Sequence, residues 1–95
     1  MYVAVRNYSG SGASELFDLL GEREADVKEL ITTVPGFVSY VAARTGDDSG
    51  VTVTVCEDEA GTDESSRRAA DWVKENTTGG GSPPTINAGT TILQF

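Results

Sequence analysis

The chain has 95 residues, of which 15 are acidic, 7 are basic and none is histidine, so its net charge at pH 7 is −8. A chain of this length is expected to form one domain, spanning residues 1–95. The acidic excess disfavours phosphate backbones and anionic lipid, so we expect neither nucleic acid nor membrane partners. Without histidine, the sequence excludes a Ser-His-Asp triad, a Cys-His pair and a histidine-ligated metal or haem.

The single cysteine, Cys56, has no partner for a disulfide within the chain. The first residues, MYVAVRNYSGSG, lack the basic region and the apolar stretch of a signal peptide. Apolar runs such as Tyr2 to Val5 are too short to cross a membrane. These features predict a cytoplasmic protein.

The first predicted element is a strand from Tyr2 to Tyr8, because this segment is rich in aromatic and β-branched residues. The following SGSG segment, residues 9–12, interrupts it. Alternation along the strand places Val3, Val5 and Asn7 on one face.

A long amphipathic helix is predicted from Ala13 to about Val34. Its apolar positions recur at spacings of three, four or seven residues and include Leu16, Leu20, Val27 and Ile31. Gly21 interrupts the stripe and favours a local kink, but we expect packing to keep the helix intact. The Pro-Gly pair at residues 35–36 ends it.

Two strands and a polar turn are predicted next. Phe37 to Arg44 forms one strand, and the polar segment from Thr45 to Gly50 separates it from a second. The second strand, from Val51 to Cys56, alternates strictly and places three valines on one face. The pattern predicts a hairpin.

The second predicted helix begins with Thr62 as a hydroxyl N-cap, followed by Asp63 and Glu64 near the positive end of the helix dipole. It runs to about Asn76. Its apolar face is thin, so the indole of Trp72 is expected to supply much of its burial.

The chain is expected to end with a loop from Thr77 to Pro84 and a strand from Thr85 to Phe95, with a possible break at Gly89. The resulting β-α-β-β-α-β order predicts a ferredoxin-like α+β fold, with four antiparallel strands and two helices on one face. The opposite face would expose apolar residues. A homodimer that packs sheet against sheet would cover them.

The element order carries two local motifs: Val34-Pro35-Gly36-Phe37 at the start of the second strand, and Glu57-Asp58-Glu59-Ala60 after the third. With these motifs the chain resembles the antibiotic biosynthesis monooxygenase family, which consists of dimeric α+β barrel proteins. Its cofactor-independent oxygenases and its haem-degrading branch pair an Asn near the end of the first strand with a Trp on the second helix. Asn7 and Trp72 match these positions. The haem-ligating His of that branch has no counterpart in the stretch 75–79.

The resemblance implies that Asn7 and Trp72 are catalytic. Asn7 would hydrogen-bond a developing oxyanion and Trp72 would form a flat wall, while Tyr40 and Arg44 would bind the substrate. It implies oxidation of a small polycyclic phenol or quinol by oxygen, with no metal or other cofactor. The structural alternatives are a strand-end amide that bonds the loop backbone at Asn7, a core anchor at Trp72 and sheet packing at Tyr40. Because groups suited to acid-base catalysis are scarce, a non-catalytic ligand-binding or interaction module of the same fold is the alternative function.

Overall fold

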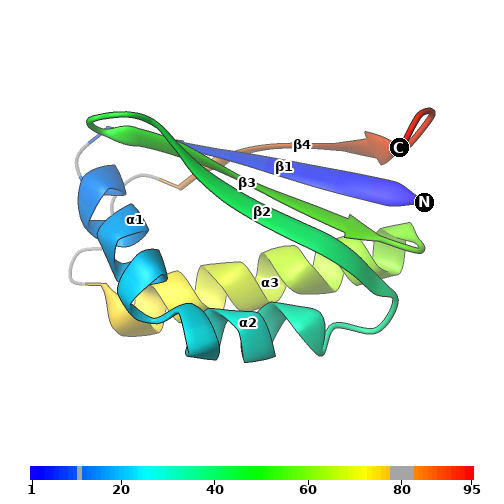
Figure 1. Ribbon diagram of the computed structural model, residues 1–95, viewed down its shortest axis with the longest axis horizontal. Coiled ribbons are helices and arrows are strands. Elements are labelled where there is room, and N and C mark those ends of the chain that lie inside the picture. Colours follow the sequence, from blue (N-terminus) through cyan, green and yellow to red (C-terminus); the bar gives the residue numbers. More distant parts are fainter. Residues whose placement is uncertain (11, 78–82) are drawn as a thin grey trace.

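A computed structural model describes residues 1–10, 12–77 and 83–95 of the chain. Its elements are β1 (Tyr2–Ser9), α1 (Ala13–Glu22), α2 (Glu24–Thr32), β2 (Phe37–Gly46), β3 (Ser49–Cys56), α3 (Glu59–Asn76) and β4 (Thr85–Thr90). The strands form one antiparallel sheet in the order β2-β3-β1-β4. All three helices cover the same face of the sheet (Figure 1). The ferredoxin-like fold is therefore confirmed.

The prediction of one long first helix is wrong, because the chain leaves helical geometry at Arg23 (φ −107°, ψ 34°). The N–H of Arg23 bonds the carbonyl of Leu19 at 2.8 Å and closes α1, while its own carbonyl accepts from the N–H of Val27 at 3.0 Å in α2. The break redirects the chain, so that α1 packs on β3 and α2 packs on β2 and α3. Gly21, just before the break, is a weak helix former, so less helical stability is lost when the helix is interrupted there.

The predicted start of the second helix is also wrong. Asp58, not Thr62, is the N-cap of α3: its backbone is extended, and its Oδ1 accepts from the N–H of Gly61 at 3.0 Å. Thr62 lies inside the first turn, where its hydroxyl donates to the carbonyl of Glu59 at 2.9 Å. The carboxylate of Asp58, two residues after the end of β3, thus satisfies one of the free N–H groups of the first turn, and the helix begins before Thr62.

The last strand is shorter than predicted. Thr90 pairs with Tyr2, the first residue of β1, and the N–H of Thr91 bonds the carbonyl of Met1 at 2.9 Å. Residues 92–95 therefore have no strand left to pair with on β1, and Ile92 and Phe95 are exposed. The predicted loop from Thr77 to Pro84 lies mostly outside the described residues.

The core lies between the sheet and the helices and comprises Tyr8, Ala13, Leu16, Phe17, Val27, Ile31 and Trp72. The other side of the sheet, which we call the open face, bears the valines of three strands. Val5 and Val41 both pair with Val53 there, and Val41 is 57% exposed. Among the described residues, no helix is long and apolar enough to span a membrane.

Candidate functional site

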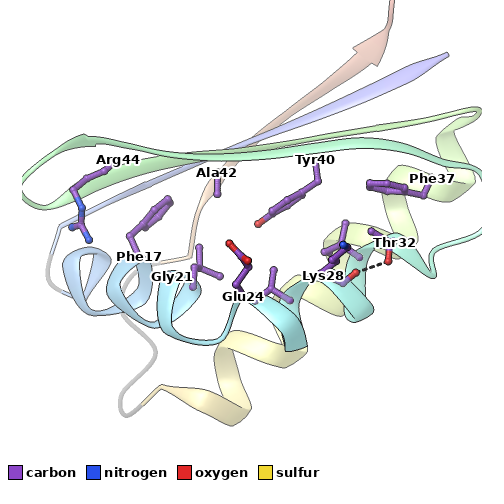
Figure 2. A pocket seen from close by; sticks show the side chains of 12 residues that line it. Phe17, Gly21, Glu24, Lys28, Thr32, Phe37, Tyr40, Ala42 and Arg44 are labelled. Atoms are coloured by element: carbon purple, nitrogen blue, oxygen red, sulfur yellow. Dashed lines mark hydrogen bonds between the residues drawn. The ribbon is translucent and has the colours of Figure 1, made fainter.

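A cleft of about 610 Å³ lies between β2 and the two helices α1 and α2 (Figure 2). Its apolar lining consists of Phe17, Leu20, Val27, Ile31, Phe37 and Ala42. Its polar lining consists of Glu24, Lys28, Thr32, Tyr40 and Arg44. A concave, largely apolar space with a few polar groups is the usual form of a small-molecule site.

Phe17 defines one end of the cleft through two contacts. Its ring meets that of Tyr8 edge to face, with centroids 5.8 Å apart and an interplanar angle of 70°. On the sheet side it lies against Gly50, where a side chain would collide with the ring. A glycine in β3 thus lets the aromatic ring of α1 rest directly on the sheet.

Tyr40 provides a polar group on the sheet side of the cleft. Figure 2 shows Tyr40 reaching from β2 and Glu24 reaching from α2 into the same space. Burial raises the pKa of Tyr40 to about 12, against the opposing effect of the positive charge of Arg6. Tyr40 is therefore a protonated hydrogen-bond donor at neutral pH, consistent with the predicted substrate-binding role.

Arg44 lines the same cleft, near Phe17 (Figure 2). Its guanidinium forms an ion pair with Asp18 of α1 at 2.7 Å and donates to the Ser14 hydroxyl at 3.4 Å. The side chain is 40% exposed. Arg44 thus joins β2 to α1, and Asp18 neutralises part of its charge. The structure brings Tyr40 and Arg44, the two predicted substrate-binding residues, together in one cleft.

Trp72 lies behind the cleft rather than in it. It is 8% exposed and lines a second cavity of about 20 Å³, enough for about one water molecule. Leu20, Val27, Ile31 and Tyr40 line both spaces and separate Trp72 from the cleft. The guanidinium of Arg23 lies 6.0 Å from the indole centroid. Trp72 is a core residue in this structure, and its catalytic role stays a prediction.

Asn7 does not share a space with Trp72. Its neighbours Arg6 and Tyr8 are buried on the helix side, 1% and 7% exposed, so alternation places the exposed Asn7 on the open face. Asn7 and Trp72 therefore do not line one pocket between the sheet and the helices of this chain. The physical reason is that the helices pack on the face of β1 that carries Ala4. The catalytic role of Asn7 remains untested.

Arg6 is a buried polar residue outside the set of site residues predicted from the sequence. Its guanidinium donates to hydroxyls of Thr52 and Thr54 on β3 and of Ser65 and Ser66 on α3. Burial lowers its pKa. The signal in the sequence is alternation, which puts Arg6 on the same face of the strand as Ala4 and Tyr8; the structure adds the pairing of Arg6 with Thr52. Among the described residues, no group of three or more His, Cys, Asp or Glu side chains could hold a metal ion.

No protein-family model and no curated protein matches the chain. Several solved structures do. The monooxygenase from the gene ActVA-Orf6 of Streptomyces coelicolor, in complex with the ligand nanaomycin D, has a TM-score of 0.71 and 23% identity, covering 99% of this chain and 89% of that one. SnoaB of Streptomyces nogalater, a cofactor-independent oxygenase, has a TM-score of 0.60 and 19% identity, covering 99% and 94%.

The heme-degrader MhuD of Mycobacterium tuberculosis, with two hemes bound in its active site, has a TM-score of 0.65 and 16% identity, covering 100% of this chain and 99% of that one. These identities are low, but the coverage is nearly complete in each case. The structural neighbours of this chain are antibiotic biosynthesis monooxygenase-type proteins, and the chain has their fold.

Proposed function

We propose that this protein binds a small polycyclic phenol or quinol in the cleft between β2 and the α1–α2 pair and oxidises it with molecular oxygen, without a cofactor. The observation that carries the proposal is the cleft itself: about 610 Å³, apolar on most of its lining, with Tyr40 and Arg44 beside the apolar surface. A flat aromatic ligand would be held by the apolar side chains and oriented by the polar ones. The cofactor-independent oxygenase among the neighbours supports a reaction without a cofactor, and the monooxygenase in complex with nanaomycin D supports a ligand site in this fold.

The proposed reaction oxidises the ring CH₂ of the keto tautomer of such a phenol to a carbonyl: the substrate and O₂ give a quinone and water. The substrate first loses a proton to give an enolate or phenolate. That anion transfers one electron to O₂, and the two radicals combine as a peroxide anion. This anion takes back the proton that the substrate lost and then loses water to give the carbonyl. Tyr40 donates a hydrogen bond to the anionic oxygen, and Glu24 is the carboxylate beside the cleft that accepts the proton.

Trp72 and Asn7 hold different places in the proposal. Trp72 lines the smaller cavity together with Tyr40, and Tyr40 also lines the cleft. Trp72 thus packs behind the part of the cleft that Tyr40 forms. The predicted catalytic role of Asn7 is not part of this reaction, because Asn7 lies on the open face, across the sheet from the cleft. If Asn7→Ala leaves ligand affinity and oxygen uptake unchanged in a folded protein, Asn7 has no catalytic role.

A homodimer is part of the proposal. The open face bears valines from β1, β2 and β3 that no element of the described chain covers, and Val41 is 57% exposed. A second copy that presents the same valines would cover them. We further propose a cytoplasmic location, with which the buried, unpaired thiol of Cys56 is consistent.

The second candidate function is ligand binding without catalysis. It is favoured by the cleft chemistry: Tyr40, with its pKa raised to about 12, stays protonated at neutral pH and cannot serve as a base. Glu24 is then the only carboxylate on the cleft lining described here. Oxygen uptake separates the two functions.

The experiment titrates the protein with anthrone, which can be oxidised, and with anthraquinone, its product. The fluorescence of Trp72 reports binding, because a bound chromophore would lie just beyond the shared wall. We expect saturable quenching with about one ligand per chain, and oxygen uptake with anthrone above the rate in buffer. Ala42→Phe fills the cleft and should abolish both signals, whereas Ala70→Phe, at an exposed position on α3, should preserve them. Quenching without oxygen uptake would favour the binding module, and no saturable quenching would refute both functions.

A further inference from the structure

Arg6 carries a buried positive charge for which the described chain provides no negative partner. The residue is 1% exposed. Its guanidinium donates to Ser66 Oγ at 3.1 Å, Thr52 Oγ1 at 3.2 Å, Thr54 Oγ1 at 3.0 Å and Ser65 Oγ at 2.6 Å. All four acceptors are neutral hydroxyls. They give each guanidinium nitrogen an acceptor, but they leave the charge uncompensated.

This arrangement differs from that of every other arginine of the chain. Arg23, Arg44, Arg67 and Arg68 each pair with a carboxylate at 3.0 Å or less. The chain has 15 acidic residues, so acids are not scarce. Burial of an unpaired cation is costly, and a protein that retains one usually uses its charge.

The wall between the cleft and the small cavity consists of the residues that line both, namely Leu20, Val27, Ile31 and Tyr40. Arg6 lies on the small-cavity side of this wall. Its hydrogen-bond partner Thr52 lines the small cavity together with Tyr8 and Tyr40, and Tyr40 also lines the large cleft. The charge of Arg6 reaches both phenols, because it opposes the rise that burial causes in the pKa of each. A negative charge placed against Tyr40 in the cleft would therefore also interact favourably with Arg6.

We propose that Arg6 is a positioning residue whose uncompensated charge, acting through Thr52 and Tyr40, makes the cleft prefer the ionised form of an acidic phenol or enol. The inference rests on the proposed function, because it takes the cleft as the ligand site. The anionic oxygen would accept a hydrogen bond from the Tyr40 hydroxyl and lie on the cleft side of the wall. This preference would hold the substrate in the form that gives an electron to oxygen.

Other charges also face this space, and the test must separate them from Arg6. The cleft lining includes Glu24 and Lys28 from α2 and Arg44 from β2, the last paired with Asp18 of α1. The ionisable groups that interact with Arg6 are Tyr8, Tyr40 and Cys56, all neutral at pH 7. Removal of Arg6 thus changes the charge behind the wall and leaves the cleft lining intact.

The probe is alizarin, a hydroxyanthraquinone whose visible absorption changes on ionisation, with its dimethyl ether as a ligand that cannot ionise. In the wild-type protein we expect the apparent pKa of bound alizarin to lie about one unit below that of the free dye. Arg6→Met should remove this shift and weaken binding of the ionised dye about tenfold, with the affinity for the ether unchanged. Arg67→Met, which removes the same charge from the exposed surface of α3, should preserve the shift.

Arg6→Lys keeps the charge and should keep the shift, which distinguishes charge from packing if Arg6→Met fails to fold. The inference is overturned if bound and free alizarin ionise alike in the wild type, or if Arg6→Met and Arg67→Met behave alike. If alizarin and its ether both bind but without preference for the ionised form, the proposed function stands and this inference falls. If neither dye binds, the proposed ligand site is wrong and the inference falls with it.

Discussion

Gly50 on β3 lies directly against the aromatic ring of Phe17 on α1. A Cβ atom at Gly50 would come within 3.0 Å of three atoms of that ring. Gly50 is itself buried and pairs with Tyr8, whose ring meets the edge of Phe17. The position of α1 on the sheet, and with it one end of the cleft, depends on the absence of a side chain at this position.

Gly50→Ala should therefore destabilise the protein by about 1 to 3 kcal/mol, because the new methyl group forces Phe17 out of its packed position. Chemical denaturation measures the change. Gly21→Ala is the matched control: no atom lies within 4 Å of its Cβ position. In a helix this change should stabilise the protein by about 0.5 to 1 kcal/mol. Equal effects of the two substitutions would show that Phe17 does not rest on Gly50.

The cap of α3 provides a second prediction. Asp58→Ala removes the carboxylate that accepts from the N–H of Gly61 at 3.0 Å, and should cost about 1 kcal/mol in the free energy of unfolding. Asp58→Asn retains a cap oxygen and should cost much less. A third variant, Thr62→Ala, tests the cap expected from the sequence. Thr62→Ala removes the hydrogen bond from a buried hydroxyl to the carbonyl of Glu59 rather than a cap. The loss of stability that it causes should therefore be the same in the wild type and in the Asp58→Asn variant.

The fold could be predicted from the sequence because its strands and helices have strong local signals. The alternation in β3 and the Pro-Gly pair after α2 are examples, and both lie where the pattern places them. The break at Arg23 could not be predicted in this way. Its cause is tertiary: α1 and α2 pack against different strands, and the Arg23 side chain is held by Asp26 and by Asn76 on α3.

The candidate site could be predicted only in part. Tyr40 and Arg44 alternate on β2 and line one cleft, as a strand pattern allows. Both faces of β1 carry apolar side chains, Ala4 and Tyr8 on one and Val3 and Val5 on the other, so periodicity alone does not say which face the helices cover or on which side of the sheet Asn7 lies. The packing places Ala4 and Arg6 inside. Only the pairing of β1 with the threonines of β3 shows that an arginine can be buried there.

The raised pKa of Tyr40 predicts a loss of stability in alkali. The folded protein holds this phenolic proton up to about pH 12, whereas the unfolded chain releases it near the ordinary tyrosine pKa of 10.0. The contribution of the Tyr40 proton to the free energy of unfolding is therefore complete below pH 10 and is lost as the pH rises from 10 towards 12. Tyr40→Phe should lose less stability than the wild type between pH 10 and pH 12. If the two proteins lose the same amount, the folded pKa of Tyr40 is not raised.

The valines of the open face provide the last prediction. Val41 pairs with Val53, which also pairs with Val5 on the other side, so a charge at Val41 would lie within the surface that we propose to be the dimer interface. Val41 is 57% exposed in the single chain, so Val41→Lys should leave each protomer folded. In a dimer, the same change buries two unpaired ammonium groups and should weaken association at least tenfold, which sedimentation velocity measures. Ala70→Lys on the exposed surface of α3 adds the same charge and should leave association unchanged. A wild-type protein that sediments as a monomer at all concentrations, or a Val41→Lys variant that remains as dimeric as the wild type, would contradict assembly through this face.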